Sequence, residues 1–187
     1  ATFVYIVLFI LVGSILMLVV NFLLVDKPFK FFGKSEILEQ SAVIPEYAFA
    51  DCASLKEVRM NDGLLKIEEH AFDGCSALET IGFSETLTSI GNCAFQECSS
   101  LTSIAIPDTV TSIGKQAFDG CSALASITIP DSVTSIGEYA FRDCSSLTNI
   151  VIADSVTSIG SDAFFRCSSL TSIVIPDGVT SIGGSAF

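Results

Sequence analysis

A unit of 23 residues is repeated six times without an insertion, and this repetition limits what the chain can fold into. Self-similarity at a fixed period of this size is typical of a solenoid, in which each unit packs on copies of itself. The units run from 44 to 66, 67 to 89, 90 to 112, 113 to 135, 136 to 158 and 159 to 181, and a partial seventh covers 182 to 187.

Two kinds of hydrophobic spacing occur inside each unit. In the third unit, Ala94, Phe95 and Cys98 have the spacing of one helical turn. Ile104 and Ile106 alternate as the residues of a strand do, and a Pro-Asp pair that suits a tight turn follows them in most units. Each unit therefore predicts one coil with a short parallel strand and a short helical turn.

Other repeated positions add to this picture. The β-branched sequence V-T-S-I at 133–136 predicts a second short strand. Glycine recurs at the start of the helical side, as at Gly114, but Pro45 takes this position in the first unit. Because proline cannot adopt a positive φ, the glycine is better explained by close approach of the coils. The phenylalanines from Phe49 to Phe164 should form a continuous spine in the core.

Six of the seven cysteines fall at one position of the repeat. Because this position is in register with the leucines, the cysteines are interpreted as reduced thiols in the core. Zinc sites need two close pairs of ligands, which a uniform spacing of 23 residues does not supply. Cys93 stands outside this column, and pairing within its unit is not expected. The column contains Cys52, Cys75, Cys98, Cys121, Cys144 and Cys167.

The acidity of the repeats and the shortage of histidine exclude several functions. The three lysines and three acidic residues of 1–43 cancel, so the formal net charge of −12 belongs to the repeats. Nucleic-acid binding is not expected, because phosphate contacts need clustered Lys or Arg. His70 is the only histidine, which excludes a histidine-based triad or a multi-histidine metal site. No catalytic, cofactor or metal site is predicted.

The opening of the chain has a different character. Residues 2–25 carry no charge, and a helix of this length, about 36 Å, is long enough to cross a hydrocarbon layer of about 30 Å. A transmembrane helix is therefore predicted over 1–26, followed by a juxtamembrane linker and N-terminal cap over 27–43. Phe29, Lys27 and Lys30 are typical of a chain leaving lipid, and the positive-inside tendency favours repeats on the cytoplasmic or topologically equivalent side.

Two sets of residues are candidates for binding a partner. Gly13, Ser14 and Asn21 would lie on one face of the predicted helix, where small and polar residues often contact another membrane subunit. The alternative is that such residues are tolerated singly in lipid. On the helical side of the solenoid, the aromatic and arginine residues typical of interface hot spots are Tyr139, Arg142, Phe165 and Arg166.

The phrases CSSLTSIAIPDTVTSIGKQAF (98–118) and CSSLTSIVIPDGVTSIGGSAF (167–187) resemble the BspA-like leucine-rich repeat family. The resemblance covers 44–187. It implies a curved solenoid of parallel strands used in adhesion and protein binding, common on bacterial and protist surfaces, and no catalytic residues. Phe83 and Ser84 replace the usual Ile-Pro pair, and Ala153 replaces a proline.

The sequence thus predicts an α/β leucine-rich-repeat solenoid of six full repeats and a partial seventh over 44–187, behind one transmembrane helix. Its expected function is non-catalytic protein–protein interaction, with membrane lipid and other membrane-protein subunits as partners of the helix. One hypothesis is an accessory subunit of a larger membrane complex, and the other is an adhesin or receptor at the cell surface. Because the seventh coil has only begun at Phe187, further repeats or a cap are expected to follow.

Overall fold

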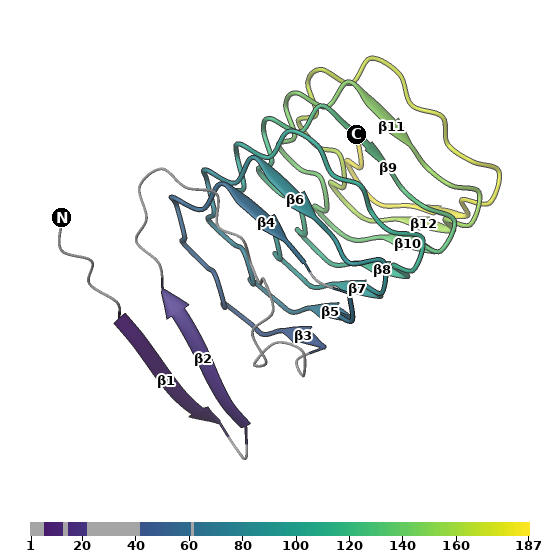
Figure 1. Ribbon diagram of the computed structural model, residues 1–187. Coiled ribbons are helices and arrows are strands. Elements are labelled where there is room, and N and C mark those ends of the chain that lie inside the picture. The colour runs from purple at the N-terminus through teal and green to yellow at the C-terminus, as the bar shows by residue number, and fades with distance from the viewer. Residues whose placement is uncertain (1–5, 13–14, 22–41, 61) are drawn as a thin grey trace.

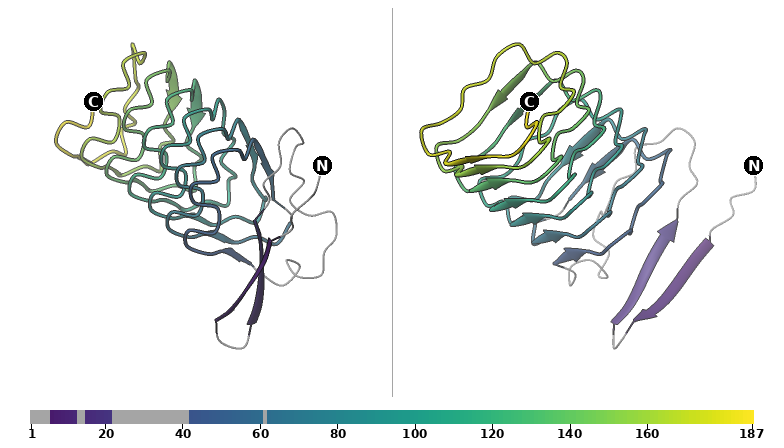
Figure 2. Two further views of the ribbon diagram at one scale, coloured as in Figure 1. Left: turned by 90° about the vertical axis from the view of Figure 1, so that its left-hand side faces the viewer. Right: turned by 180° about the vertical axis from the view of Figure 1, so that it is seen from behind.

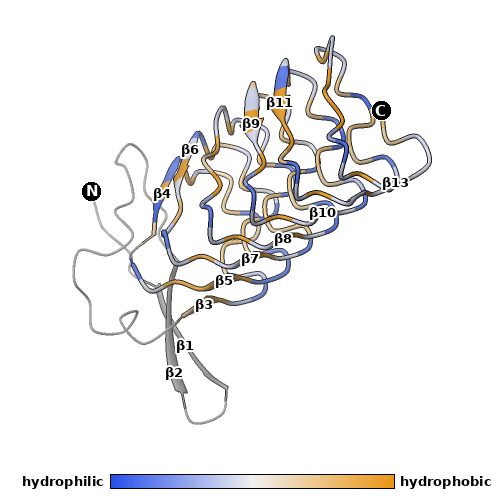
Figure 3. Cartoon of the chain, turned by 90° about the vertical axis from the view of Figure 1, so that its right-hand side faces the viewer, coloured by the Kyte–Doolittle hydropathy of each residue, from blue (hydrophilic) through white to orange (hydrophobic). Residues whose placement is uncertain are grey.

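The computed structural model describes residues 6–12, 15–21, 42–60 and 62–187. Residues 42–60 and 62–187 form a solenoid in which each 23-residue unit makes one coil, and the coils stack in sequence order (Figures 1 and 2). Hydrophobic and hydrophilic segments recur at the same places in successive coils (Figure 3). This recurrence places all apolar columns in one continuous core.

One side of the solenoid carries a parallel sheet of seven two-residue strands. Four of them lie in V-T-S-I segments, and β3, β5 and β7 lie at the same repeat position in S-A-V-I, L-L-K-I and L-T-S-I. Each strand pairs with its copy 23 residues away, as Ile67 does with Ile90. The second strand predicted for each coil is therefore confirmed. The strands are β3 (Val43–Ile44), β5 (Lys66–Ile67), β7 (Ser89–Ile90), β8 (Ser112–Ile113), β10 (Ser135–Ile136), β12 (Ser158–Ile159) and β13 (Ser181–Ile182).

The opposite side carries the strands of the other predicted strand position, which reads I-x-I from the third unit onward. β4 (Glu57–Arg59) pairs with β6 (Thr80–Gly82), and β9 (Ser126–Thr128) pairs with β11 (Asn149–Val151). Single bridges at Ser103 join the two pairs. In β6, β9 and β11 the central isoleucine is buried between two exposed residues, so the alternation in the sequence correctly predicts which side chains enter the core.

The rest of each coil is a run of turns that we call the turn arc, comprising residues 46–51, 69–74, 92–97, 115–120, 138–143 and 161–166. The helical turn predicted here is wrong, because the described residues contain no helix. In the fifth coil, the N–H groups of Tyr139 and Phe141 donate to carbonyls of the next coil, whereas that of Arg142 donates to Tyr139 three residues back. Backbone bonds therefore alternate between closing a tight turn and joining neighbouring coils.

Left-handed backbone makes this alternation possible. Two positions of the turn arc have positive φ in the described coils, and only Gly74 and Gly120 among them are glycine. The first position is occupied by Tyr47, His70, Cys93, Gln116, Tyr139, Asp162 and, in the seventh coil, Ser185. The second position is occupied by Asp51, Gly74, Glu97, Gly120, Asp143 and Arg166. An α-helix would need right-handed φ and ψ at every residue, so these positions exclude it.

The phenylalanine spine is confirmed. The rings stack face to face along the core, with centroids 5.0 Å apart between Phe49 and Phe72 and 5.4 Å apart between Phe95 and Phe118. The stack continues into the seventh coil, where Phe187 lies 5.6 Å from Phe164. Each ring buries its face against its copy in the next coil, so no coil completes its core alone.

Five of the six cysteines of the column are buried beside this spine, Cys52 is half-buried, and all seven thiols are free. Each thiol from Cys75 to Cys167 donates a hydrogen bond to the carbonyl of a spine phenylalanine 26 residues earlier, as Cys121 Sγ does to Phe95 O at 3.2 Å. Burial raises the pKa of Cys75 to about 12, and that of Cys144 well above the ordinary thiol value. The prediction that these cysteines lie in the core is confirmed for the members of the column from Cys75 to Cys167.

The glycine column marks the closest approach between coils. An ideal Cβ on Gly137 would lie 2.8 Å from the backbone carbonyl carbon and oxygen of Gly114. Backbone atoms cannot move aside as a flexible side chain can, and Gly137 does not have a positive φ. The prediction that glycine is used here for close approach is therefore confirmed.

Gly137→Ala should destabilise the protein by about 1 to 3 kcal/mol, because the methyl group would push two coils apart. Urea unfolding followed by circular dichroism measures this loss. Gly184→Ala is the matched control, since its Cβ would meet nothing within 4 Å. Equal stability of the two variants would contradict close approach as the reason for the column.

The N-terminal apolar segment differs from its prediction. β1 (Ile6–Val12) and β2 (Ile15–Asn21) pair as antiparallel strands, with Ile6 opposite Asn21. Both are rich in isoleucine and valine, whose β-branched side chains favour extended backbone. The transmembrane helix predicted over 1–26 is thus wrong for these residues, and the described part of the chain has no helix suited to crossing a bilayer. Most of the predicted linker and cap (27–43) lies outside the described residues.

Candidate functional site

The four solenoid residues predicted to bind a partner lie in the turn arcs of the fifth and sixth coils. Arg142 and Phe165 occupy the same repeat position in neighbouring coils. The Arg142 guanidinium carbon lies 4.9 Å from the centre of the Tyr139 ring, and that of Arg166 lies 5.3 Å from the Phe165 ring. We call Tyr139, Arg142, Phe165 and Arg166 the turn-side cluster.

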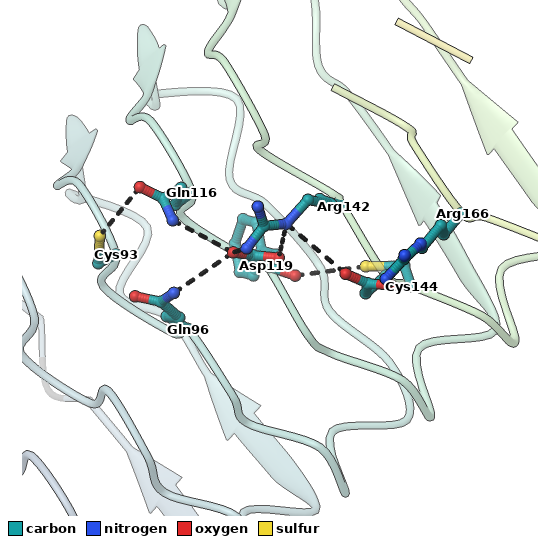
Figure 4. Close-up of polar contacts among 9 residues, drawn as sticks. Cys93, Gln96, Gln116, Asp119, Arg142, Cys144 and Arg166 are labelled. Carbon is teal, nitrogen blue, oxygen red and sulfur yellow. Dashed lines mark hydrogen bonds and ion pairs between the residues drawn. The ribbon is translucent and has the colours of Figure 1, made fainter. Parts of the chain in front are cut away.

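Within this cluster, Arg142 is held by Asp119 of the preceding coil (Figure 4). Arg142 Nε donates to Asp119 Oδ1 at 2.9 Å, and its terminal nitrogen donates to Oδ2 at 2.6 Å. Gln96 and Gln116 each donate to the same Oδ2 from their side-chain amides. Asp119 is only 1% exposed, so this paired geometry satisfies a buried carboxylate. Asp119 therefore joins three coils, and Arg142 is its partner in the fifth.

The other charges of the cluster are less constrained. Asp143 lies between two arginines, 3.6 Å from Arg142 Nε and 3.6 Å from a terminal nitrogen of Arg166. The Arg166 side chain is 68% exposed, and Phe165 is also exposed. Exposed ion pairs contribute little to stability, so Arg166 can exchange its pairing at small cost. Phe165 and Arg166 are the members of the cluster that are available to another molecule.

The acidic side of this network was not predicted from the sequence. Asp119, Gln96 and Arg142 occupy one repeat position in consecutive coils, so opposite charges 23 residues apart were a signal that could have revealed the pair. Glu97 lies close by, and desolvation together with the charges of Asp119 and Asp143 raises the pKa of its carboxyl group. The network shows that neighbouring coils exchange polar contacts as well as apolar ones.

Of the three candidates in the N-terminal segment, only Asn21 is among the described residues. Gly13 and Ser14 lie outside the described residues. Asn21 ends β2. Because β2 is a strand, the helical face that Ser14 and Asn21 were predicted to share is absent from the described residues.

The side chains that could act as a general base or a nucleophile, His70 and Cys93, pack against other residues of the solenoid. His70 Nδ1 lies 2.8 Å from Asp73 Oδ2, and its ring stacks on Tyr47 with centroids 4.7 Å apart. Cys93 is buried, and burial raises the pKa of its thiol, which disfavours the reactive thiolate. Among the residues that the structure describes, no three His, Cys, Asp or Glu side chains are grouped to hold a metal ion.

The parallel coils, the ladder of short strands and the buried leucine, cysteine and phenylalanine columns define a leucine-rich-repeat solenoid. The model of the BspA type leucine rich repeat region matches residues 31–119 and 90–187, in six copies. The chain belongs to this family. A search of curated proteins found no significant match.

Solved structures share this fold. A leucine rich repeat protein of T. pallidum is 34% identical to this chain, with a TM-score of 0.73. The match covers 75% of this chain and 66% of the T. pallidum protein. A leucine rich cell surface protein of Faecalibacterium prausnitzii is 41% identical with a TM-score of 0.66, and covers 71% of this chain. A leucine-rich repeat protein of Eubacterium ventriosum is 26% identical with a TM-score of 0.74, and covers 81%. The chain spans 66%, 36% and 41% of the lengths of these proteins.

Proposed function

We propose that this protein is a leucine-rich-repeat protein of the cell surface whose solenoid binds a protein partner without catalysing a reaction. The observation that carries the proposal is the 41% identity, over 71% of the chain, to a leucine rich cell surface protein. A regular stack of coils offers a long, rigid surface at little entropic cost, and such surfaces suit binding.

The turn-side cluster is the proposed contact on this surface. Interface hot spots favour aromatic residues and arginine, and they need side chains that are free to meet a partner. Phe165 and Arg166 meet both conditions, whereas Arg142 contributes mainly by holding the neighbouring coils in place. A partner with an apolar group and a carboxylate would match the Phe165 ring and the Arg166 guanidinium.

The apolar segment 2–25 is proposed to attach the protein to membrane lipid. It contains no charged residue, and Lys27, Phe29 and Lys30 follow it directly. The cytoplasmic placement of the repeats depended on the predicted helix and is replaced by the cell surface. Binding to other membrane-protein subunits remains a prediction that the described residues do not test, and it receives no support from β1 and β2.

Labelling of intact cells tests both parts of the proposal. A membrane-impermeant amine reagent should modify Lys115, which is exposed on the turn arc, without cell lysis. A crosslinker added to the same cells should join the solenoid to a partner, and the yield should fall at least fivefold with Phe165→Ser combined with Arg166→Glu.

Labelling of Lys115 only after lysis would overturn the surface location. Equal crosslinking of the double variant would instead overturn the turn-side cluster as the contact. Tyr47→Ser is the control, because Tyr47 is an exposed aromatic residue of the turn arc in the first coil.

A further inference from the structure

The first and sixth coils carry complementary residues at the last two positions of the turn arc. In the sixth coil these positions hold Phe165 and Arg166, the two members of the turn-side cluster that are available to another molecule. In the first coil they hold Ala50 and Asp51, a small apolar residue followed by an exposed carboxylate. The apolar group and carboxylate that would match the turn-side cluster are therefore present on the chain itself.

These two ends of the solenoid cannot meet within one molecule. Asp51 and Arg166 are five coils apart, and because parallel strands are spaced by about 4.8 Å, roughly 24 Å separates them along the solenoid. The Asp51 carboxylate lies over Gly74 of the second coil, where an ideal Cβ would come within 2.6 Å of Asp51 Oδ1. No Lys or Arg among the described residues forms an ion pair with Asp51, so its carboxylate can pair with a cation of another molecule.

A second copy brings the two ends together if the turn arcs of the copies face each other in antiparallel orientation. Twofold symmetry then places the first coil of each copy against the sixth coil of the other, so that every contact occurs twice. When the twofold axis runs parallel to the coils, equal repeat positions face each other. Asp51 then meets Arg166, and Ala50 meets Phe165.

The inner coils agree with this arrangement, in which the second coil faces the fifth and the third faces the fourth. At the last two positions of the arc, each charged residue meets an opposite charge or a residue without charge, and Phe165 meets a small residue. The facing pairs are Asp51 with Arg166, Gly74 with Asp143, Glu97 with Gly120, Ala50 with Phe165, Asp73 with Arg142 and Gln96 with Asp119.

One pair of like charges arises elsewhere in the facing arcs, between Glu69 and Glu138. It is compensated, because Lys115 Nζ lies 2.9 Å from a carboxylate oxygen of Glu138. Tyr47 faces Asp162, to which its hydroxyl can donate. Since Tyr47→Ser keeps a hydroxyl at this place, that variant remains a control for the turn-side cluster.

We propose that the protein forms an antiparallel homodimer through its turn arcs, in which the turn-side cluster of each copy binds Ala50 and Asp51 of the other. This inference rests on the proposed function and deepens it by identifying the partner of the turn-side cluster as a second copy of the chain. Complementary charge fixes the orientation of the two copies. Because they run in opposite directions, their N-terminal segments lie at opposite ends of the dimer, as a contact between two cells requires.

Zero-length crosslinking of the full chain in detergent micelles tests this pairing. Arg166→Lys supplies an amine, and a carbodiimide joins an amine to a carboxylate only where the two are in contact. Mass spectrometry should find the lysine introduced at position 166 bonded to Asp51, in a product of twice the mass of the chain. The separation of roughly 24 Å excludes this bond within one copy. Asp51→Asn should abolish it.

The same reaction contains its own control. Asp143 Oδ1 lies 3.6 Å from Arg166 in the same copy, so a bond between the introduced lysine and Asp143 shows that the chemistry has worked. A bond to Asp143 without one to Asp51 would overturn the homodimer.

Charge reversal gives a second, quantitative test by sedimentation velocity in the same detergent. Arg166→Glu and Asp51→Arg should each raise the dissociation constant of the dimer at least tenfold, and the two together should restore it to within threefold of the parent. Both replacements suit the left-handed backbone of this position, since Glu97 and Arg166 adopt it. Lys56→Glu changes the net charge as Arg166→Glu does, but lies outside the turn arcs, and should change the constant less than twofold.

A parent chain that sediments as a monomer, or a double variant that associates no better than the single ones, would contradict the homodimer. In that case, a crosslinked product on intact cells with a mass other than twice that of the chain would still support the proposed function. Absence of any crosslinked product on cells would count against both, so the two failures are distinguishable.

Discussion

Phe118→Ala is expected to destabilise the protein by about 3 to 5 kcal/mol, because it removes a fully buried ring from the middle of the spine. Phe118 stacks on Phe95 and Phe141 at centroid distances of 5.4 Å on both sides. The cavity would therefore weaken two interfaces between coils at once. Urea unfolding followed by circular dichroism should show a lower midpoint and a less cooperative transition.

The control for this substitution is Phe187→Ala. Phe187 occupies the same repeat position but is half exposed, and among the described residues its stacking partner is Phe164. Its loss should cost less than half as much. If the two variants unfold at the same urea concentration as the parent, the spine does not couple the coils.

Alkaline pH is expected to destabilise the folded protein strongly, through the thiol column. Burial raises the pKa of Cys75 to about 12 and of Cys167 to about 11, and raises those of Cys121 and Cys144 well above 9.0. Above pH 9 the folded state therefore keeps thiol protons that the unfolded state releases. Stability falls as pH rises, by about 1.4 kcal/mol per pH unit for each such thiol, until the folded-state pKa is reached.

Urea unfolding between pH 7 and pH 10.5, under reducing conditions, measures this slope. Cys121→Ala with Cys144→Ala should lower stability at pH 7, because each substitution leaves a small cavity, but should reduce the slope above pH 9 by about 2.7 kcal/mol per pH unit. Lysine and tyrosine titrations are common to both proteins and cancel in the comparison. Identical slopes would show that the column does not control alkaline stability.

The core was predicted correctly from the sequence because the same apolar pattern occurs in six copies, so an exception in one unit does not hide it. Phe95, Cys98 and Leu101 recur in coil after coil, and a column that stays apolar over six copies has to face its neighbours. The strands of four coils were equally clear, since the alternation of Ile127 with exposed residues matches the period of a strand. The third coil forms only single bridges at Ser103, and no strand forms at 171–176 in the sixth. These inferences depend only on which side chains are buried.

The prediction of a helical turn was wrong because it also depended only on which side chains are buried. Ala140, Phe141 and Cys144 are all buried, so their spacing satisfies the helical pattern. Periodicity shows which side chains face the core, but it does not show where backbone N–H groups donate. Here every second N–H of the turn arc bonds to the next coil, and no single unit contains that information.

The N-terminal segment and the candidate site show two further limits. An apolar run without a charge is compatible with a helix or with strands, and the β-branched residues of β1 and β2 favour strands. At the site, Arg142 was identified from its residue type as a contact for a partner. Its bonds to the buried Asp119 assign it a role in the solenoid itself, and only the stacking of coils reveals that pair.

The left-handed residues of the turn arc have a consequence for how the solenoid folds. Non-glycine residues such as Gln116 and Tyr139 adopt a conformation that costs roughly 1 to 2 kcal/mol each in an isolated peptide. A lone coil would lack the N–H bonds to its neighbour that offset this cost, and it would relax. The first two or three coils must therefore form together as a nucleus. Each further coil can then form its backbone hydrogen bonds to a neighbour that is already folded.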